Sequence, residues 1–270
     1  FARAGRVLVE SPRGSEWFEG ARRAAQAVIE HLWSAEQRRL LRRYRDGEAG
    51  VGGFWEDYAF LIWGLLELFQ ASGDAEWLGR AMVLSRIQAE LFFDERDGGW
   101  FSTTGKDPSV LLRLKEDYDG AEPSAASVSV RNLILLADLT GETAYAERAR
   151  RTLERYGTNI APVVRVMPFM VSNVAYWHGR KGQIVIAGPR QAPETTALEQ
   201  AIARRYLPFA VVIPLEPGAG QQTLAARLPW LGAMAPRDGL PSTYVCYDFT
   251  CQAPVTEAGV VLGTVGYMAP

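Results

Sequence analysis

The amino-acid sequence predicts a mainly α protein of stacked helical hairpins, followed by a small α/β unit. The first observation is an internal repeat. The segment "LLELFQASGDAEWLGRA", which starts at Leu65, matches "LILLADLTGETAYAERA", which starts at Leu133. Each copy has an apolar helix end, a glycine, an acid, an aromatic residue and an alanine, which predicts a helix, a tight turn and a second helix. The second observation is a change of pattern after Gly182, where short runs rich in valine and isoleucine begin.

Apolar residues at helical spacing place the individual helices of the repeats. The predicted helices run over residues 17–34, 56–71, 75–92, 123–140, 143–157 and 163–178, alternately inner and outer. A weaker copy of the repeat, from Gly5 to Ala21, lacks the first helix of its hairpin. We therefore expect the helical region, residues 1–182, to be N-terminally truncated, with upstream hairpins missing. The apolar flank of this first hairpin should then be partly exposed, at Val7, Leu8, Val28 and Leu32.

Residues 183–270 form the predicted α/β unit. Two apolar runs, 183–188 and 209–215, flank a helical stretch over 194–205, which is a β-α-β pattern. Residues 218–222 are predicted as a flexible loop, and residues 242–246 as a third strand.

Composition narrows the classes of function. The chain has 270 residues, of which 48% are hydrophobic, and a formal net charge of -2, which argues against nucleic acid and polybasic membrane surfaces as partners. No apolar run is long enough to span a bilayer. Two cysteines do not make a disulfide-rich secreted scaffold, so a reducing cytoplasm is the default expectation. Two histidines and two cysteines far apart in sequence predict no metal site, and no cofactor is expected. Cys246 and Cys251 could form a redox pair, but two unrelated thiols are favoured.

Two long connections, residues 42–56 and 94–124, lead into inner helices and so should lie on one rim of the stack. This rim has more acidic residues than are required to cap the helices that begin there. Asp57, Asp119 and Glu122 are the candidate catalytic residues, with Asp117 as a further surplus acid, because paired carboxylates can act as general acid and base on a glycosidic bond. Capping alone explains Asp57 and Glu122 about equally well.

Aromatic and basic residues of the same rim are candidates for binding a substrate. Aromatic rings offer flat faces to a sugar, although core packing is the favoured interpretation for them. Basic side chains can hold acidic or hydroxyl groups, and Ser124 also suits the start of a helix. The candidate substrate-binding residues are Trp55, Tyr58, Trp100, Arg113, Lys115, Tyr118 and Ser124.

Several stretches together resemble one family: "GFWEDYAFLIWGLLELFQASGD", "LFFDERDGGWFSTT", "LLRLKEDYDGAEPSAASVSVRNLILLADLTG" and "YVCYDFTCQAPVTE". The sequence is similar to the C-terminal half of thioredoxin-domain-containing proteins of the spermatogenesis-associated type. The resemblance implies an incomplete (α/α)6-type toroid, like that of N-acylglucosamine 2-epimerases and six-hairpin glycosidases. It also implies an N-terminal thioredoxin-like domain, which this sequence does not contain.

Two functions are therefore predicted. The first is a carbohydrate-active toroid that binds or processes a sugar through its rim carboxylates. The alternative is a non-catalytic scaffold that presents a thioredoxin-like domain to partners. If Asp57, Asp119 and Glu122 share a cavity, their mutual repulsion should raise the pKa of at least one of them.

Overall fold

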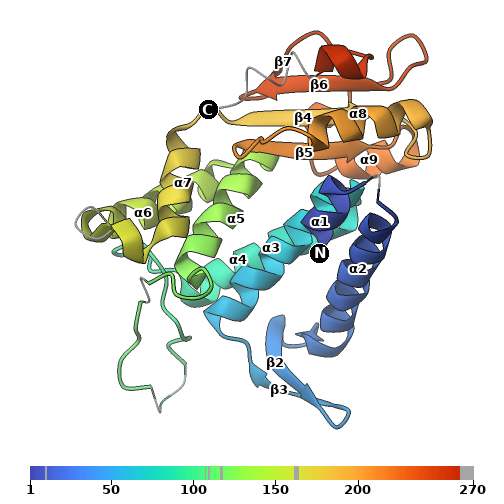
Figure 1. Ribbon diagram of the computed structural model, residues 1–270. Coiled ribbons are helices and arrows are strands. Elements are labelled where there is room, and N and C mark those ends of the chain that lie inside the picture. The colour runs from blue at the N-terminus through green and yellow to red at the C-terminus, as the bar shows by residue number, and fades with distance from the viewer. Residues whose placement is uncertain (10, 107, 109, 116–117, 161–163, 262–270) are drawn as a thin grey trace.

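A computed structural model describes the whole chain except residues 10, 107, 109, 116–117, 161–163 and 262–270. Its helical part is an arc of hairpins (Figure 1). Inner helices α1, α3, α5 and α7 pack side by side in this order, and α2, α4 and α6 cover them from outside. The arc confirms the predicted fold class, a mainly α, incomplete toroid of helical hairpins. The helices are α1 (Ala2–Val7), α2 (Pro12–Leu32), α3 (Trp55–Ser72), α4 (Ala75–Phe92), α5 (Ala125–Thr140), α6 (Thr143–Ile160) and α7 (Pro168–His178).

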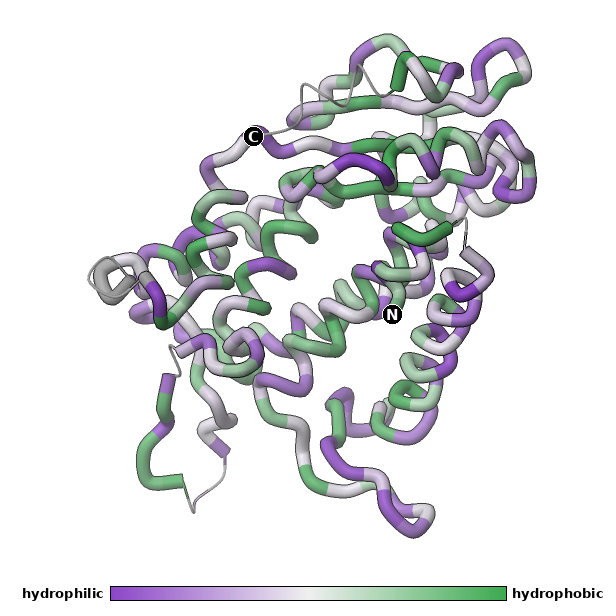
Figure 2. The backbone as a smooth tube through the Cα atoms, in the orientation of Figure 1, coloured by the Kyte–Doolittle hydropathy of each residue, from purple (hydrophilic) through white to green (hydrophobic). Residues whose placement is uncertain are grey.

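The first hairpin differs from its prediction. A short inner helix, α1, does precede α2, and α2 starts earlier than expected because Ser11 caps it and Pro12 suits its first turn. Purple and green alternate along α2 in Figure 2, as in a helix with one face on solvent. Val7 and Leu8 are more than two-fifths exposed, and Val28 and Leu32 are partly exposed, as expected.

Glycine explains why the repeat is visible in the sequence. Gly73 ends α3 and Gly141 ends α5, both with φ near +70°, a conformation that residues with a side chain rarely adopt. A Cβ at Gly73 would also lie 2.1 Å from the carbonyl oxygen of Pro214. Asp74 then caps α4 by accepting a hydrogen bond from the N–H of Glu76.

The α/β unit follows the helices, with strand order β5-β4-β6-β7. β4 and β5 are parallel and joined through α8, as the β-α-β pattern predicts, while β6 and β7 run antiparallel. The segment expected to be a flexible loop is instead part of helix α9, because Leu224 is buried and the amide of Gln221 donates to the carbonyl of Met234. The elements are β4 (Gly182–Ala187), α8 (Pro193–Ala203), β5 (Ala210–Leu215), α9 (Ala219–Ala225), β6 (Ser242–Tyr247) and β7 (Thr250–Cys251).

This unit covers the C-terminal ends of the inner helices (Figure 1). Arg190 donates to the carbonyls of Ala71 and Ser72 at the end of α3, and so satisfies acceptors that a helix end leaves open. The side chain of Gln70 accepts from the N–H of Val212 in β5. One hydrophobic core runs from the helices into the sheet. The division into a helical-hairpin region, residues 1–182, and a small α/β unit, residues 183–270, stays a prediction.

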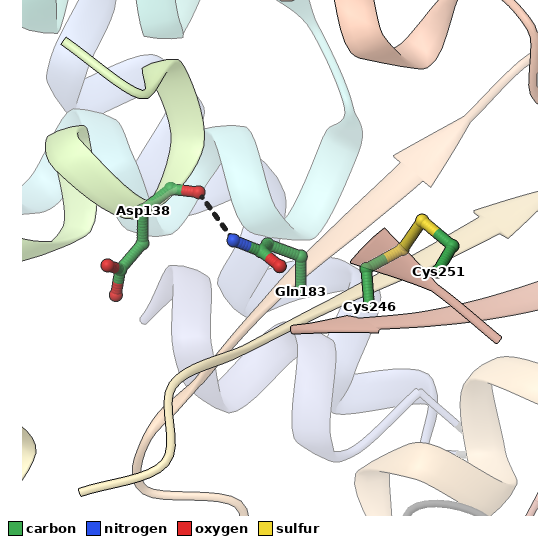
Figure 3. The surroundings of a disulfide bond; sticks show 4 residues. All are labelled: Asp138, Gln183, Cys246 and Cys251. Atoms are coloured by element: carbon green, nitrogen blue, oxygen red, sulfur yellow. Dashed lines mark hydrogen bonds between the residues drawn. A yellow bond between two sulfur atoms is a disulfide. The ribbon is translucent and has the colours of Figure 1, made fainter. Parts of the chain in front are cut away.

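The two cysteines are bonded to each other, which corrects the expectation of unrelated thiols. β6 and β7 form a tight hairpin that sets Cys246 directly opposite Cys251, and a disulfide joins them (Figure 3). Spacing alone did not reveal the hairpin. Beside it, the amide of Gln183 donates to the backbone carbonyl of Asp138 at the end of α5. Structural disulfides are typical of oxidising compartments, so the cytoplasmic location stays a prediction.

In the part of the chain described above, no helix is both long and apolar enough to cross a membrane.

Candidate functional site

Both long connections lie at the end of the arc opposite the sheet, beside the N-termini of inner helices (Figure 1). We call this end the acidic rim. The first connection is a β-structure rather than a loop, because β2 (Arg39–Arg45) and β3 (Glu48–Gly52) pair as antiparallel strands of a hairpin. A short strand, β1 (Trp33–Ser34), joins β2 on its other side. The second connection, from residue 94 to residue 124, contacts α4 through Arg113 and α6 through Glu95, whereas Leu111 and Leu112 are exposed.

Asp57 occupies the third position of α3. Its carboxylate accepts a hydrogen bond of 2.8 Å from the N–H of Phe54 and lies 3.8 Å from the guanidinium of Arg42. Partial burial raises the pKa of Asp57, against the opposing effects of that hydrogen bond and of Arg42. Repulsion from neighbouring Glu56 is the smallest of these causes. Asp57 is thus held as a helix cap, and burial rather than a shared cavity raises its pKa.

Asp119 is buried and joins the N-termini of two inner helices. One carboxylate oxygen accepts from the N–H of Ser124 and from the hydroxyl of Ser127, both at 2.7 Å, at the start of α5. The other oxygen accepts from the N–H groups of Phe169 and Met170, at 2.9 and 3.3 Å, at the start of α7. Helix N-termini favour negative charge, so this carboxylate ties α5 to α7.

Glu122 is exposed, and Tyr118 beside it is 63% exposed. Ser124 is the N-cap of α5 and accepts from the N–H of Ser127. In the described part of the chain, no hydrogen bond or ion pair links Asp57, Asp119 and Glu122 to one another. Asp117 lies outside the described residues.

Three of the candidate aromatic rings belong to the core. Trp55 and Trp100 are stacked, with ring centroids 6.4 Å apart, and Tyr58 packs on Phe92. All three are almost completely buried. The indole N–H of Trp55 donates to Ser129, and the hydroxyl of Tyr58 accepts from the N–H of Leu40 in β2. Their ring faces are covered by protein, so these residues support the acidic rim by packing in the core rather than by binding a ligand.

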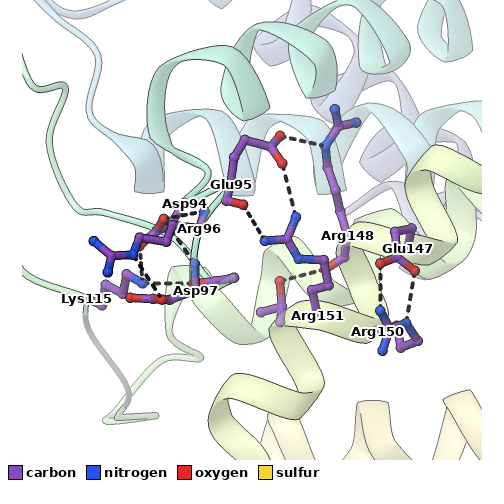
Figure 4. A network of polar contacts seen from close by, with 11 residues as sticks. Asp94, Glu95, Arg96, Asp97, Lys115, Glu147, Arg148, Arg150 and Arg151 are labelled. Atoms are coloured by element: carbon purple, nitrogen blue, oxygen red, sulfur yellow. Dashed lines mark hydrogen bonds and ion pairs between the residues drawn. The ribbon is translucent and has the colours of Figure 1, made fainter.

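The candidate basic residues Lys115 and Arg113 hold parts of the second connection in place, and Lys115 is shown in Figure 4. Lys115 donates to Asp94 at 2.6 Å and to the carbonyl of Gly98 at 2.8 Å. Burial opposes ionisation of Asp94, but Lys115 and two backbone N–H groups outweigh it, so the pKa of Asp94 is lowered. Arg113 donates to the carbonyl of Thr103 and lies over the ring of Phe101.

The turn at "DGG" is a hairpin turn, as expected, because Phe93 and Trp100 on either side form an antiparallel bridge. Gly98 and Gly99 both have φ above +70°. On the outer side of this turn, Arg151 of α6 binds both the carboxylate and the carbonyl of Glu95. The network therefore fastens the connection to α6.

Sequence reasoning missed a second polar group, on the inner face of the arc. Trp63 of α3 stacks on Phe169 of α7 at 5.4 Å and donates to Glu67 one turn on. Arg3 of α1 pairs with Glu67 and lies over the indole of Trp63. Burial would raise the pKa of Glu67, but Arg3 and Arg6 outweigh it, so the pKa is lowered. A glutamate within the apolar run "LIWGLLELF" was the available signal.

Arg3, Trp63 and Glu67, which we call the inner-face cluster, border an open cavity of about 470 Å3 between α1, α2 and α3. Phe60, Trp63, Arg3 and Glu67 line its polar and aromatic side, and small apolar residues of α2 line the other.

The helical arc with its appended sheet defines an α/α hairpin protein of the toroid class. No family model matches the chain. Spermatogenesis-associated protein 20 of Homo sapiens is 35% identical over 246 residues, covering 88% of this chain and 31% of the human protein. The protein of the same name from Rattus norvegicus is 34% identical over 266 residues, covering 95% of this chain and 33% of the rat protein. Over this span the chain belongs to the family of spermatogenesis-associated protein 20, and it spans about a third of the length of these relatives.

Two more distant likenesses complete the comparison. The protein B0495.5 of Caenorhabditis elegans is 29% identical over 209 residues, or 77% of this chain and 28% of that protein. Among solved structures, cellobiose 2-epimerase from Spirochaeta thermophila DSM 6192 matches with a TM-score of 0.47 and 21% identity, over 61% of this chain and 43% of that one.

Proposed function

We propose that this chain is a non-catalytic binding module within a longer protein, and that its rim carboxylates organise the fold. The observation that carries the proposal is Asp119, whose two oxygens accept four hydrogen bonds from the starts of α5 and α7. A general acid or base must reach a substrate proton and exchange its own, which a carboxylate committed to four buried donors does poorly. Asp57 is similarly used as a cap.

The longer protein would supply the rest of the function. The family resemblance supports a thioredoxin-like domain elsewhere in it, and this module would hold that domain in position for its partners. About two thirds of the length of each relative lies outside the part that this chain matches, which leaves room for such a domain.

The alternative is an enzyme that processes a sugar through the rim carboxylates. One experiment distinguishes it from a non-catalytic module. Full-length protein, with Glu122→Gln and Asp57→Asn variants, is assayed for turnover on a panel of glycosides and reducing sugars. We expect no turnover by the wild type or by either variant. Turnover by wild-type protein that disappears in Glu122→Gln, at unchanged thermal stability, would show that the rim is an active site.

A sugar ligand is the second candidate, and the inner-face cluster favours it. Trp63 offers an aromatic platform, while Glu67 and Arg3 supply hydrogen-bonding groups beside a cavity of about 470 Å3. This combination of an aromatic face and a few placed polar groups is typical of small-molecule sites. Ligand-observed NMR with mono- and disaccharides tests it. Binding should be lost in Trp63→Leu and kept in the control Trp177→Phe, and equal binding by all three proteins would contradict an inner-face site.

A further inference from the structure

We propose that a second pocket, between α1, α5 and the connection from α8 to β5, binds the phosphate or carboxylate group of a small metabolite. Of its described lining residues, it shares only Arg3 with the cavity beside the inner-face cluster. The pocket has a volume of about 200 Å3. Four arginines from three segments line it: Arg3, Arg6, Arg131 and Arg205. Among the described residues, its lining includes no carboxylate. We call it the arginine pocket, and it goes beyond the binding module and the sugar site proposed above.

Among the described residues, the negative charge near the arginine pocket is too little to balance Arg3, Arg6 and Arg131. Glu67 is the acid whose charge reaches Arg3, Arg6 and Arg131, and it already forms its ion pair with Arg3. Asp138 also reaches Arg131, as the weakest of its electrostatic partners. Burial accordingly lowers the pKa of both Arg6 and Arg131, despite these neighbours. The pocket therefore carries an excess of positive charge.

Two of these guanidinium groups each have one N–H donor without a hydrogen-bond partner among the described residues. Nε of Arg6 and Nε of Arg131 are both buried, and neither has a hydrogen-bond partner within the described structure. A buried donor without a partner is costly, and more so when it belongs to a charged group. An oxyanion in the pocket would accept these hydrogen bonds and offset the charge at the same time.

Arg131 is already fixed in place. It donates to the carbonyl of Pro208 at 3.1 Å, and its guanidinium lies 4.3 Å from the ring centre of Tyr176. Because this orientation exists before any ligand arrives, binding costs little side-chain entropy.

The shape of the donors selects the ligand class. Guanidinium groups bind phosphate and carboxylate through paired hydrogen bonds, and a 200 Å3 pocket admits a small molecule rather than a polymer. Phosphate-bearing and carboxylate-bearing probes, tested one by one, show which of the two groups the pocket binds.

The test is isothermal titration calorimetry of the full chain with inorganic phosphate, acetate, glucose 6-phosphate and glucose. We expect at least one of the three anions to bind at fixed ionic strength and glucose not to bind in this pocket. Affinity for that anion should fall at least tenfold in Arg6→Gln and in Arg131→Gln. Arg150→Gln is the matched control, because Arg150 lies exposed on α6 and pairs with Glu147 and Glu154.

Arg131→Gln could disturb the fold through Pro208, so near-UV circular dichroism is recorded for every variant. Arg6→Gln removes no hydrogen bond to a described residue and carries the test alone if the Arg131 variant unfolds. Absence of binding by all three anions, or equal anion affinity in wild type, Arg6→Gln and Arg150→Gln, would overturn the proposal. Trp63→Leu should keep anion binding, which separates this site from the sugar site.

Discussion

The two ends of α5 each hold a buried aspartate, and their carboxylates are in opposite electrostatic settings. Asp119, at the N-terminal end, accepts four hydrogen bonds from helix starts. Asp138, in the last turn, has one carboxylate oxygen that is buried without a hydrogen-bond partner in the described residues, and Lys181 is 3.8 Å from the other. Burial raises the pKa of Asp138 to about 6. The same residue type therefore stabilises one end of the helix and costs stability at the other.

The largest expected effect is at Asp119. Asp119→Ala leaves buried N–H groups of α5 and α7 without acceptors, and each such group costs about 1–3 kcal/mol. We expect a loss of about 3 kcal/mol or more in the free energy of unfolding, measured by urea denaturation. Asp57→Ala, which removes a single more exposed cap, is the comparison and should lose about 1 kcal/mol. Equal losses in the free energy of unfolding for the two variants would contradict a special role of Asp119.

The next effect is at Asp138 and depends on pH. Its pKa is about 6 in the folded state against an ordinary 3.8, so between these values the folded state binds more protons than the unfolded state. The stability gained from that proton is present below about pH 4 and is lost as pH rises through 6. Asp138→Asn should therefore be more stable than wild type at pH 8, by up to about 3 kcal/mol, and the two should converge near pH 4.

Thermal denaturation between pH 4 and pH 8 measures this difference. Asp46→Asn, an exposed change at a turn, is the control and should follow the wild type throughout. A wild type that is more stable than Asp138→Asn at pH 8 would contradict the raised pKa.

Loss of the Cys246–Cys251 disulfide should have a smaller effect on the free energy of unfolding. Cys246 and Cys251 close a very short loop, for which chain entropy alone gives about 2 kcal/mol. Cys251→Ser should lower the stability of oxidised protein by about this amount. The variant's stability should then be insensitive to dithiothreitol, whereas that of the wild type should fall to the same level. A wild type that does not respond to the reductant would show that this bond contributes little.

The smallest expected effect is at Glu122, which is exposed on the acidic rim. Glu122→Gln should change the free energy of unfolding by less than about 0.5 kcal/mol at neutral pH, as surface substitutions usually do. A clear loss at neutral pH that vanishes in acid would instead identify Glu122 as a cap of α5.

The hairpins could be predicted from the sequence because their signals are local. Gly73 and Gly141 mark turns through the backbone conformation that each requires, and apolar spacing marks the helices on either side. The strands of the α/β unit were found for the same reason. Helix α9 was missed because its stability comes from the burial of Leu224 against distant segments.

The candidate site was harder to predict because its contacts are distant in sequence. Asp119 was predicted as a catalytic acid beyond the needs of capping. Its link to α7 could not be predicted, because its partners Phe169 and Met170 lie 50 and 51 residues further on. Trp55 and Trp100 were placed on the acidic rim, and only the packed structure shows that they cover each other. Arg6 and Arg131 gave no signal, since isolated arginines are ordinary on helices.

Hydrogen exchange in Asp119→Asn tests the central claim most directly. Asparagine keeps one acceptor oxygen and replaces the other by an amide nitrogen, which cannot accept. If Asp119 ties α5 to α7, backbone N–H groups at the starts of these helices, residues 124–127 and 169–171, should exchange much faster than in wild type. Those of α4 should exchange at the wild-type rate after correction for global stability. Unchanged exchange at both helix starts would contradict the account and return Asp119 to the list of candidate catalytic acids.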